Sequence, residues 1–252
     1  MAPTTSARVV ELLAWMQSRG SRKNVDGMAR YGIVADKVFG ISVGTLRAKA
    51  KQIGRHHALA IALWKTGWYE ARMLAALIDD PAALTATQMD QWAKQFDNWA
   101  ICDTTCFHLF DKSPLAWSRI RAWHRRKDEF VRRAAFALIA SVALHDKTAD
   151  DALFVPCLMM IEAAATDDRN FVKKGVSWAL RGIGKRSAEL HAPAVTLATR
   201  LSQSSSKSAR WIGADAMKDL QTPATKAQLA RTAARRARRA AKTVSRRRGR
   251  AT

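Results

Sequence analysis

Three related stretches of sequence decide the fold: FVRRAAFAL at residues 130–138, FVKKGVSWAL at residues 171–180 and ARWIGADA at residues 209–216. In each stretch, apolar and small residues recur with the period of an α-helix, and a basic residue holds the same place, at Arg132, Lys173 and Arg210. These positions lie 41 and 37 residues apart. Steps of that length are typical of helical repeats that stack on one another.

Outside these stretches, helical periodicity continues along most of the chain and strand alternation is almost absent. We therefore expect an all-α protein, a solenoid of HEAT-like helix pairs whose second helices line a concave inner surface. Turn residues such as Asp79-Asp80-Pro81 and Ser113-Pro114 separate the helices. The expected helices are 6–19, 42–53, 56–65, 69–78, 87–96, 99–110, 116–125, 130–144, 152–165, 171–182, 188–202 and 209–220.

The charge balance indicates a polyanionic partner. The chain has 43 Lys and Arg against 21 Asp and Glu, a net charge of +22. From Pro223 onward there are eleven Lys or Arg and no acid, so residues 1–222 keep half of the excess, +11. Charge on the body as well as the tail favours nucleic acid bound in a basic groove, although a soluble protein with merely basic surfaces remains an alternative. We expect a repeat domain over residues 1–222 and a basic, disordered Arg/Ala-rich tail over 223–252, with a helix that forms on binding as the alternative for the tail.

Composition and motifs argue against several other classes. The apolar runs are too short to span a membrane, and the first residues do not have the pattern of a secretory signal. Cys102, Cys106 and Cys157 suit reduced thiols in the cytoplasm. Cys102, Cys106 and His108 do not have the spacing of a four-ligand zinc site, and no glycine-rich phosphate loop is present. We expect no metal, no nucleotide cofactor and no membrane partner.

Helical angles of about 100° per residue single out side chains that point away from a core. Arg133 lies opposite the apolar stripe of its helix, beside small residues, and Arg132 lies on its flank. Arg133 is therefore the better candidate for binding a phosphate. On the helix from Phe171, Trp178 joins Lys174 and Arg181 on the side opposite the core, where an aromatic ring among cations suits nucleic acid. The structural alternatives are an arginine that is solvated or in a surface ion pair, and a tryptophan packed against a neighbouring repeat.

Trp99 and Asp103 are four residues apart and therefore share one face of a helix. A carboxylate beside an exposed indole is an unusual surface in so basic a protein, and it is a candidate site. The alternative is an aspartate paired with a basic neighbour and a tryptophan that fills a repeat interface. The spacing by itself favours that alternative.

An ordered set of short motifs resembles the AlkD-type DNA alkylation repair glycosylases. The resemblance extends from Val9 to Leu220, and the basic tail lies outside it. No single motif is specific, but seven in the right order are hard to obtain by chance. They are Phe39-Gly-Ile-Ser, Leu46-Arg-Ala-Lys-Ala, Leu63-Trp64, Glu70-Ala-Arg, Asn98-Trp-Ala-Ile-Cys-Asp103, Phe130-Val-Arg-Arg-Ala-Ala and Phe171-Val-Lys-Lys-Gly-Val-Ser-Trp-Ala-Leu-Arg181.

The resemblance implies a C-shaped solenoid around duplex DNA that hydrolyses the N-glycosidic bond of N3- or N7-alkylated purines in base excision repair. The family's active-site Trp and Asp fall on Trp99 and Asp103, its phosphate-side Arg on Arg133 and its second aromatic on Trp178. Many relatives carry an acid directly after the first tryptophan, where this chain has Ala100. The departure leaves Asp103 without a second carboxylate to assist it.

This residue set suits the chemistry that the resemblance implies. A cationic alkylpurine leaves as a neutral base, so no general acid is needed, and a fixed carboxylate can stabilise the charge that develops on the deoxyribose and orient water. Such a role requires that Asp103 not be held in an internal ion pair. The alternative is a non-catalytic damage sensor or scaffold that binds nucleic acid. In either case we expect a monomer, cytoplasmic and associated with the nucleoid through DNA.

Overall fold

The computed structural model describes residues 3–248, with side chains as far as residue 238. Over that range the chain forms fourteen α-helices and two short 3₁₀ helices, with no strand, which confirms the all-α prediction. It divides into two compact units, Met1–Leu138 and Ile139–Thr252. The division falls inside helix α9 (Glu129–His145).

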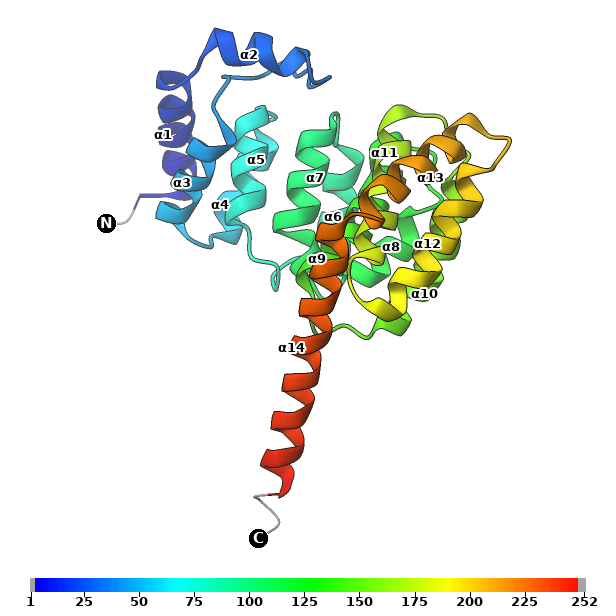
Figure 1. The fold of residues 1–252 in the computed structure, drawn as a ribbon. Coiled ribbons are helices and arrows are strands. Elements are labelled where there is room, and N and C mark those ends of the chain that lie inside the picture. The colour runs from blue at the N-terminus through cyan, green and yellow to red at the C-terminus, as the bar shows by residue number, and fades with distance from the viewer. Residues whose placement is uncertain (1–2, 249–252) are drawn as a thin grey trace. The chain divides into compact units, whose positions relative to one another are not determined.

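The first unit contains eight complete helices, coloured blue to green in Figure 1. Helix α5 packs against α3, α4 and α7, and α1 packs against α4. Most N-termini carry a side-chain cap, as at Ser42, whose hydroxyl accepts from Thr45 N–H. The helices are α1 (Thr5–Ser18), α2 (Arg22–Ala29), α3 (Val43–Ile53), α4 (His57–Lys65), α5 (Tyr69–Ile78), α6 (Ala86–Lys94), α7 (Trp99–His108) and α8 (Ala116–Trp123), with the 3₁₀ helix η1 (Phe110–Lys112).

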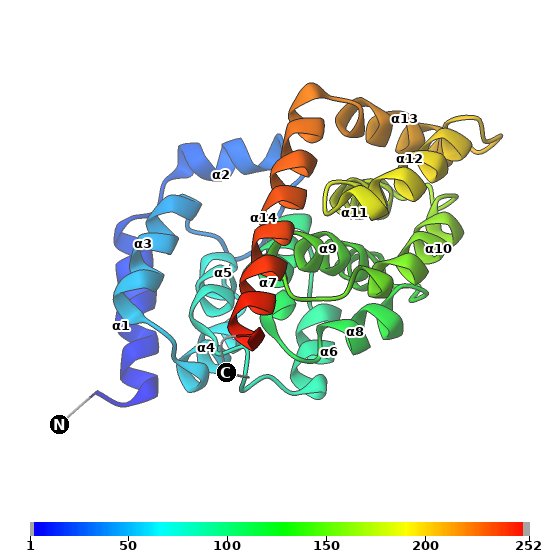
Figure 2. The same ribbon diagram turned by 60° about the horizontal axis from the view of Figure 1, so that its bottom comes forward.

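In the second unit, α11, α12 and α13 pack against one another in all three pairs. Figure 2 shows them together, with α14 following α13. Gly213 of α13 lies so close to the backbone of α12 at Ala198 and Ser202 that a Cβ atom would overlap it. The elements are η2 (Asp151–Phe154), α10 (Val155–Ala164), α11 (Asn170–Gly184), α12 (Ala188–Ser202), α13 (Lys207–Leu220) and α14 (Pro223–Arg248).

Helix α9 is buried around its whole circumference. Every residue from 133 to 143 is buried, as expected of a helix in the protein interior rather than one with a single apolar stripe. The expectation that Arg133 faces an open side is therefore wrong. Its side chain is only 7% exposed, because the face opposite the stripe is covered as well.

Two helices were not expected. The tail from residue 223, expected to be disordered, forms α14 as far as Arg248; residues 249–252 lie outside the described range. Alanine and arginine are strong helix formers, and the Thr222 hydroxyl accepts from Thr225 N–H at the first turn. Helix α14 contacts α12 and α13. The other unexpected helix, α2, contains no buried residue, so it has no apolar stripe by which to detect it. No helix in the described range is long and apolar enough to cross a membrane.

Candidate active site and DNA interface

Helix α7 places Trp99 and Asp103 on one face. The Asn98 side chain caps its N-terminus by accepting from Ile101 N–H at 3.0 Å. Next to that face, Ile101, Cys102, Thr105, Cys106 and Leu109 are all buried. The core stripe therefore fixes the rotation of the helix and holds Trp99 and Asp103 at its margin.

Asp103 and Arg133 form a bidentate ion pair within the first unit. Arg133 Nε donates to one carboxylate oxygen at 2.8 Å, and Nη2 donates to the other at 2.6 Å. The Asp103 side chain keeps 19% of its surface exposed. Burial raises the pKa of Asp103, while the charge and hydrogen bonds of Arg133 act in the opposite direction. Burial likewise disfavours charge on Arg133, but Asp103 outweighs it and raises the Arg133 pKa.

This pair corrects two features of the sequence-based hypothesis. Asp103 is not a lone carboxylate: it is paired with a basic residue, the alternative that the spacing favoured, and it is held in the internal ion pair that a catalytic role required it to avoid. A catalytic role for Asp103 therefore requires this pair to open. Arg133 is not an open phosphate anchor, because it is buried and bound to Asp103. Helical angles cannot show this, since the two residues lie thirty positions apart and meet only through the packing of α7 against α9.

The Trp99 indole is half-buried, and its N–H donates to the backbone carbonyl of Tyr31 at 2.9 Å. Tyr31 belongs to residues 21–39, a segment with no buried residue. Tyr31 as a whole residue is 73% exposed. A segment that sequence patterns did not single out therefore orients the candidate active-site tryptophan.

Glu70 anchors that segment at its C-terminal end. The carboxylate is fully buried and accepts from the backbone N–H groups of Phe39, Gly40 and Ile41. At the N-terminal end, Ser21 N–H donates to the Phe39 carbonyl at 2.8 Å. Two motifs of the resemblance, Phe39-Gly-Ile-Ser and Glu70-Ala-Arg, are thus joined by hydrogen bonds, and their role in this structure is to hold a loop.

The second unit carries three of the candidate DNA-binding residues, all on α11. Trp178 is half-buried and Lys174 is exposed. Arg181 Nε donates to the Ser177 carbonyl, and the guanidinium lies 3.6 Å from Asp215 and from Asp219. Arg181 is therefore partly neutralised by α13. In the first unit, Arg132 is more exposed than Arg133.

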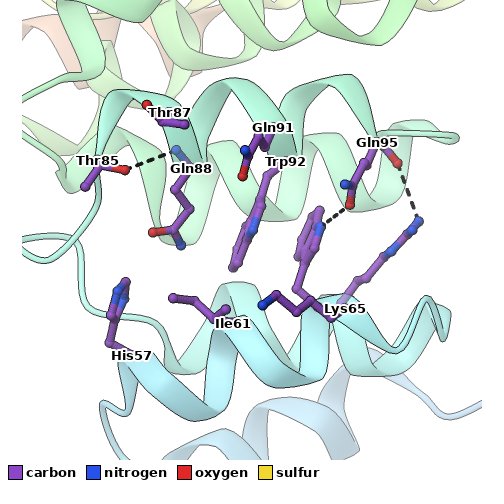
Figure 3. Close-up of a pocket in the computed structure, with 11 residues that line it drawn as sticks. His57, Ile61, Lys65, Thr85, Thr87, Gln88, Gln91, Trp92 and Gln95 are labelled. Carbon is purple, nitrogen blue, oxygen red and sulfur yellow. Dashed lines mark hydrogen bonds between the residues drawn. The ribbon is translucent and has the colours of Figure 1, made fainter.

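A separate groove of about 590 Å³ lies between α4 and α6, and the sequence did not predict it (Figure 3). Trp64 and Trp92 stack at its floor with ring centroids 3.8 Å apart. At one end, His57 Nδ1 lies 2.6 Å from the fully buried Asp79, which also accepts from Gln88. Burial raises the pKa of Asp79. These contacts join α4, α5 and α6, and they account for the buried carboxylate as a structural group.

Metal ligands do not gather at either place. In residues 3–248, no group of three or more His, Cys, Asp or Glu side chains could hold a metal ion. The Cys102 and Cys106 thiols are buried in the core of the first unit. Burial raises the pKa of Cys106 well above its ordinary value, which keeps that thiol protonated.

Comparison with known proteins identifies the family. A family model described as DNA alkylation repair enzyme matches residues 12–240. The chain belongs to this family. The match runs past Leu220, so the first part of α14 lies inside the family domain and not beyond it.

One solved structure resembles this DNA alkylation repair family member over most of its length. That structure represents what is described as a new family of proteins related to the HEAT-like repeat DNA glycosylases with affinity for branched DNA structures. The TM-score is 0.68 at 20% sequence identity, covering 76% of this chain and 82% of that one. At this identity the likeness shows the fold, and it confirms the HEAT-like repeat. None of the curated proteins matches the chain.

Proposed function

We propose that this family member is a DNA glycosylase that hydrolyses the N-glycosidic bond of cationic N3- or N7-alkylated purines in duplex DNA. The observation that carries the proposal is the Asp103 carboxylate, held rigidly one helical turn from Trp99 with part of its surface open to solvent. Because the damaged base already carries positive charge, it leaves without a general acid. A carboxylate is then the group that the reaction needs at the sugar.

The ion pair changes the role assigned to Arg133. In the free protein it orients Asp103 and offsets its charge, so an isolated anion is not available to the substrate. On binding, a backbone phosphate offers Arg133 equivalent charge-assisted hydrogen bonds, and the cationic nucleotide offers Asp103 a new counter-charge. In this proposal the pair opens on binding. Arg133, whose side chain is 7% exposed in the free protein, turns toward a phosphate, and Asp103 faces the deoxyribose as positive charge develops.

The other candidate residues keep supporting roles in the proposal. The π face of Trp99 stabilises the developing cation, and its position depends on the hydrogen bond to Tyr31. Trp178, Lys174, Arg132 and Arg181 bind the DNA backbone from α11 and α9, with Arg181 the weakest contributor because Asp215 and Asp219 compete for it. The net charge of +22 supplies the general attraction for DNA.

A second candidate function is non-catalytic recognition of DNA, and the ion pair itself favours it. A bidentate Asp–Arg pair in the protein interior serves equally well as a structural contact, and Ala100 stands where many members of the resembling family carry an acid. In that case the Asp103–Arg133 pair persists when DNA binds.

Incubation with a duplex containing N7-methylguanine tests the main proposal. We expect free base and abasic sites well above the spontaneous background. Asp103→Asn should lower the single-turnover rate by about 100-fold or more, as removal of one electrostatic group does elsewhere, with DNA affinity retained. Asp97→Asn is the matched control, because Asp97 is a nearby carboxylate that is also paired with an arginine, Arg72. Base release no greater than the spontaneous background would contradict the glycosylase proposal and favour non-catalytic recognition of DNA.

Arg133→Ala tests the exchange of partners. If Arg133 binds a phosphate, the slope of the logarithm of affinity against the logarithm of salt concentration should fall in magnitude by about 1. Arg119→Ala is the control, because Arg119 is likewise ion-paired with an aspartate in the first unit. An unchanged slope in Arg133→Ala would mean that the ion pair stays closed on DNA.

A further inference from the structure

A cluster of cationic side chains lies in the second unit where α14 packs against the turns that follow α9 and α11. It surrounds a small open pocket of about 60 Å³. Lys147 comes from the first turn and Arg186 from the second, whereas Thr232, Arg235 and Arg236 come from α14. Four of these five side chains carry positive charge and can donate hydrogen bonds, whereas the Thr232 hydroxyl already donates to the Gln228 carbonyl at 3.0 Å.

Arg186 forms a rigid part of the pocket. Its guanidinium donates to the backbone carbonyls of Ala143, Asp146 and Ala149 and to the Asp151 carboxylate. It also lies over the Phe154 ring, 4.4 Å from the centroid. The side chain is 2% exposed, so the fold fixes this cation in place before any ligand binds.

Asp151 fastens α14 to this cluster. Its two oxygens accept from Arg236 Nη1 and Nη2 at 2.7 and 2.9 Å, and one of them also accepts from Arg186. Glu189 lies 3.6 Å from Arg236. The charge of Arg236 is therefore largely offset, and the ion pair explains why a strongly basic helix docks at this place.

Lys147 and Arg235 differ from Arg236 in this respect. Among the described residues, no carboxylate lies within ion-pair distance of either side chain. Burial lowers the pKa of Lys147, and the nearby Arg186, Arg235 and Arg236 lower it further. A cation surrounded by cations at the mouth of a pocket favours an anion that accepts several hydrogen bonds at once.

We propose that Lys147, Arg235 and the fixed Arg186 form a binding site for a phosphate group of the DNA backbone, completed by the docking of α14. A phosphodiester has the right chemistry, since its two free oxygens can accept from Lys147 and Arg235. The site is separate from the Trp99, Asp103 and Arg133 residues of the first unit. It requires DNA binding but not base release, so it survives if the proposed glycosylase activity fails.

Salt-dependent binding of undamaged duplex DNA to the full chain tests the site. In Lys147→Ala/Arg235→Ala, which leaves the Asp151–Arg236 pair intact, the salt slope should fall in magnitude by about 0.9, the value for one phosphate that the protein no longer neutralises. The control Lys226→Ala/Arg231→Ala removes two charges from the same helix outside the pocket, and Lys147→Arg/Arg235→Lys keeps both charges within it. Slopes that fall equally in the pocket variant and the control, or that do not fall, would overturn the proposal.

A second measurement separates DNA phosphate from free phosphate. The isotope-labelled Lys147 ammonium group of the wild-type protein is followed by NMR during titration with duplex DNA and, separately, with inorganic phosphate. We expect DNA to shift the Lys147 signal and to displace phosphate where phosphate binds. A shift with inorganic phosphate alone would overturn the assignment to DNA, and no shift with either would overturn the site itself.

Discussion

At the scale of single residues, the largely buried Asp103–Arg133 pair is the decisive feature of this protein. Either charge alone would be costly in that position, because a buried ion without its partner loses hydration and gains nothing in return. Together they form two short hydrogen bonds and join α7 to α9. The Asp103–Arg133 ion pair therefore stabilises the folded chain. In the proposed reaction, Asp103 would have to give up this ion pair.

Arg133→Met should accordingly destabilise the protein more than the loss of packing explains. We expect the free energy of unfolding to fall by about 3 kcal/mol, the lower part of the range for stranding a buried charge, because Asp103 keeps some contact with solvent. The double variant Asp103→Leu/Arg133→Met should recover most of that loss. Denaturant unfolding measures both, and equal destabilisation of the two variants would show that the pair contributes little.

Tyr69 offers a direct test of burial. Burial and the neighbouring Glu70 and Asp97 carboxylates raise its pKa to about 12 from an ordinary 10.0. The chain has only two tyrosines, so Tyr31→Phe isolates this one. Its ultraviolet titration should have a midpoint near 12. Because the folded pKa is the higher, Tyr69 stabilises the folded state fully below pH 10 and progressively less between pH 10 and 12. A midpoint near 10 would contradict the burial.

At the scale of elements, most helices follow from local sequence. The expected ranges 69–78 and 188–202 coincide with α5 and α12, and the others differ from the observed helices by a few residues at their ends. Helix α2 was missed because it buries nothing, and α14 because its composition also suits a disordered tail. Capping residues and apolar stripes are local properties of the sequence. The docking of a polar helix such as α14 depends instead on residues distant in the sequence, such as Asp151.

Two glycines distinguish helix α13, which packs closely against α12, from helix α2, which buries no residue. Gly213→Ala should destabilise the protein by about 2 kcal/mol or more, because the added Cβ would overlap the backbone of α12, which cannot move as a side chain can. Gly27→Ala, in α2, meets nothing within 4 Å, and should be neutral or stabilising by up to about 1 kcal/mol through helix propensity. Thermal and denaturant unfolding compare them; similar effects would contradict the packing of α13 on α12.

At the scale of the whole molecule, charge is distributed between a domain and a basic extension. The family match ends at residue 240, and residues 241–252 carry five further Lys or Arg. We expect these charges to attract DNA without belonging to either proposed site. General attraction and site chemistry should therefore be separable by deletion.

Deletion of residues 241–252 should weaken DNA binding at low salt and lower the magnitude of the salt slope by up to about 0.9 for each phosphate that is no longer neutralised. For the proposed glycosylase activity, the single-turnover rate of base release at saturating protein should stay within about two-fold of wild type, because Trp99, Asp103 and Arg133 are all in the first unit. Binding and single-turnover assays at several salt concentrations measure the two effects. A large fall in the single-turnover rate at saturating protein would show that residues 241–252 take part in base release.

The sequence by itself determined the all-α class, the helical repeat, the basic character and the pairing of Trp99 with Asp103 on one helix face, because each is set by composition or by spacing within a single helix. The tertiary structure decided that Arg133 is buried against Asp103, that Tyr31 holds the Trp99 indole, and that Lys147, Arg186 and Arg235 converge. These contacts join residues at least thirty positions apart. These partners are determined by the way the helices pack against one another. The spacing of residues within a single helix does not contain that information.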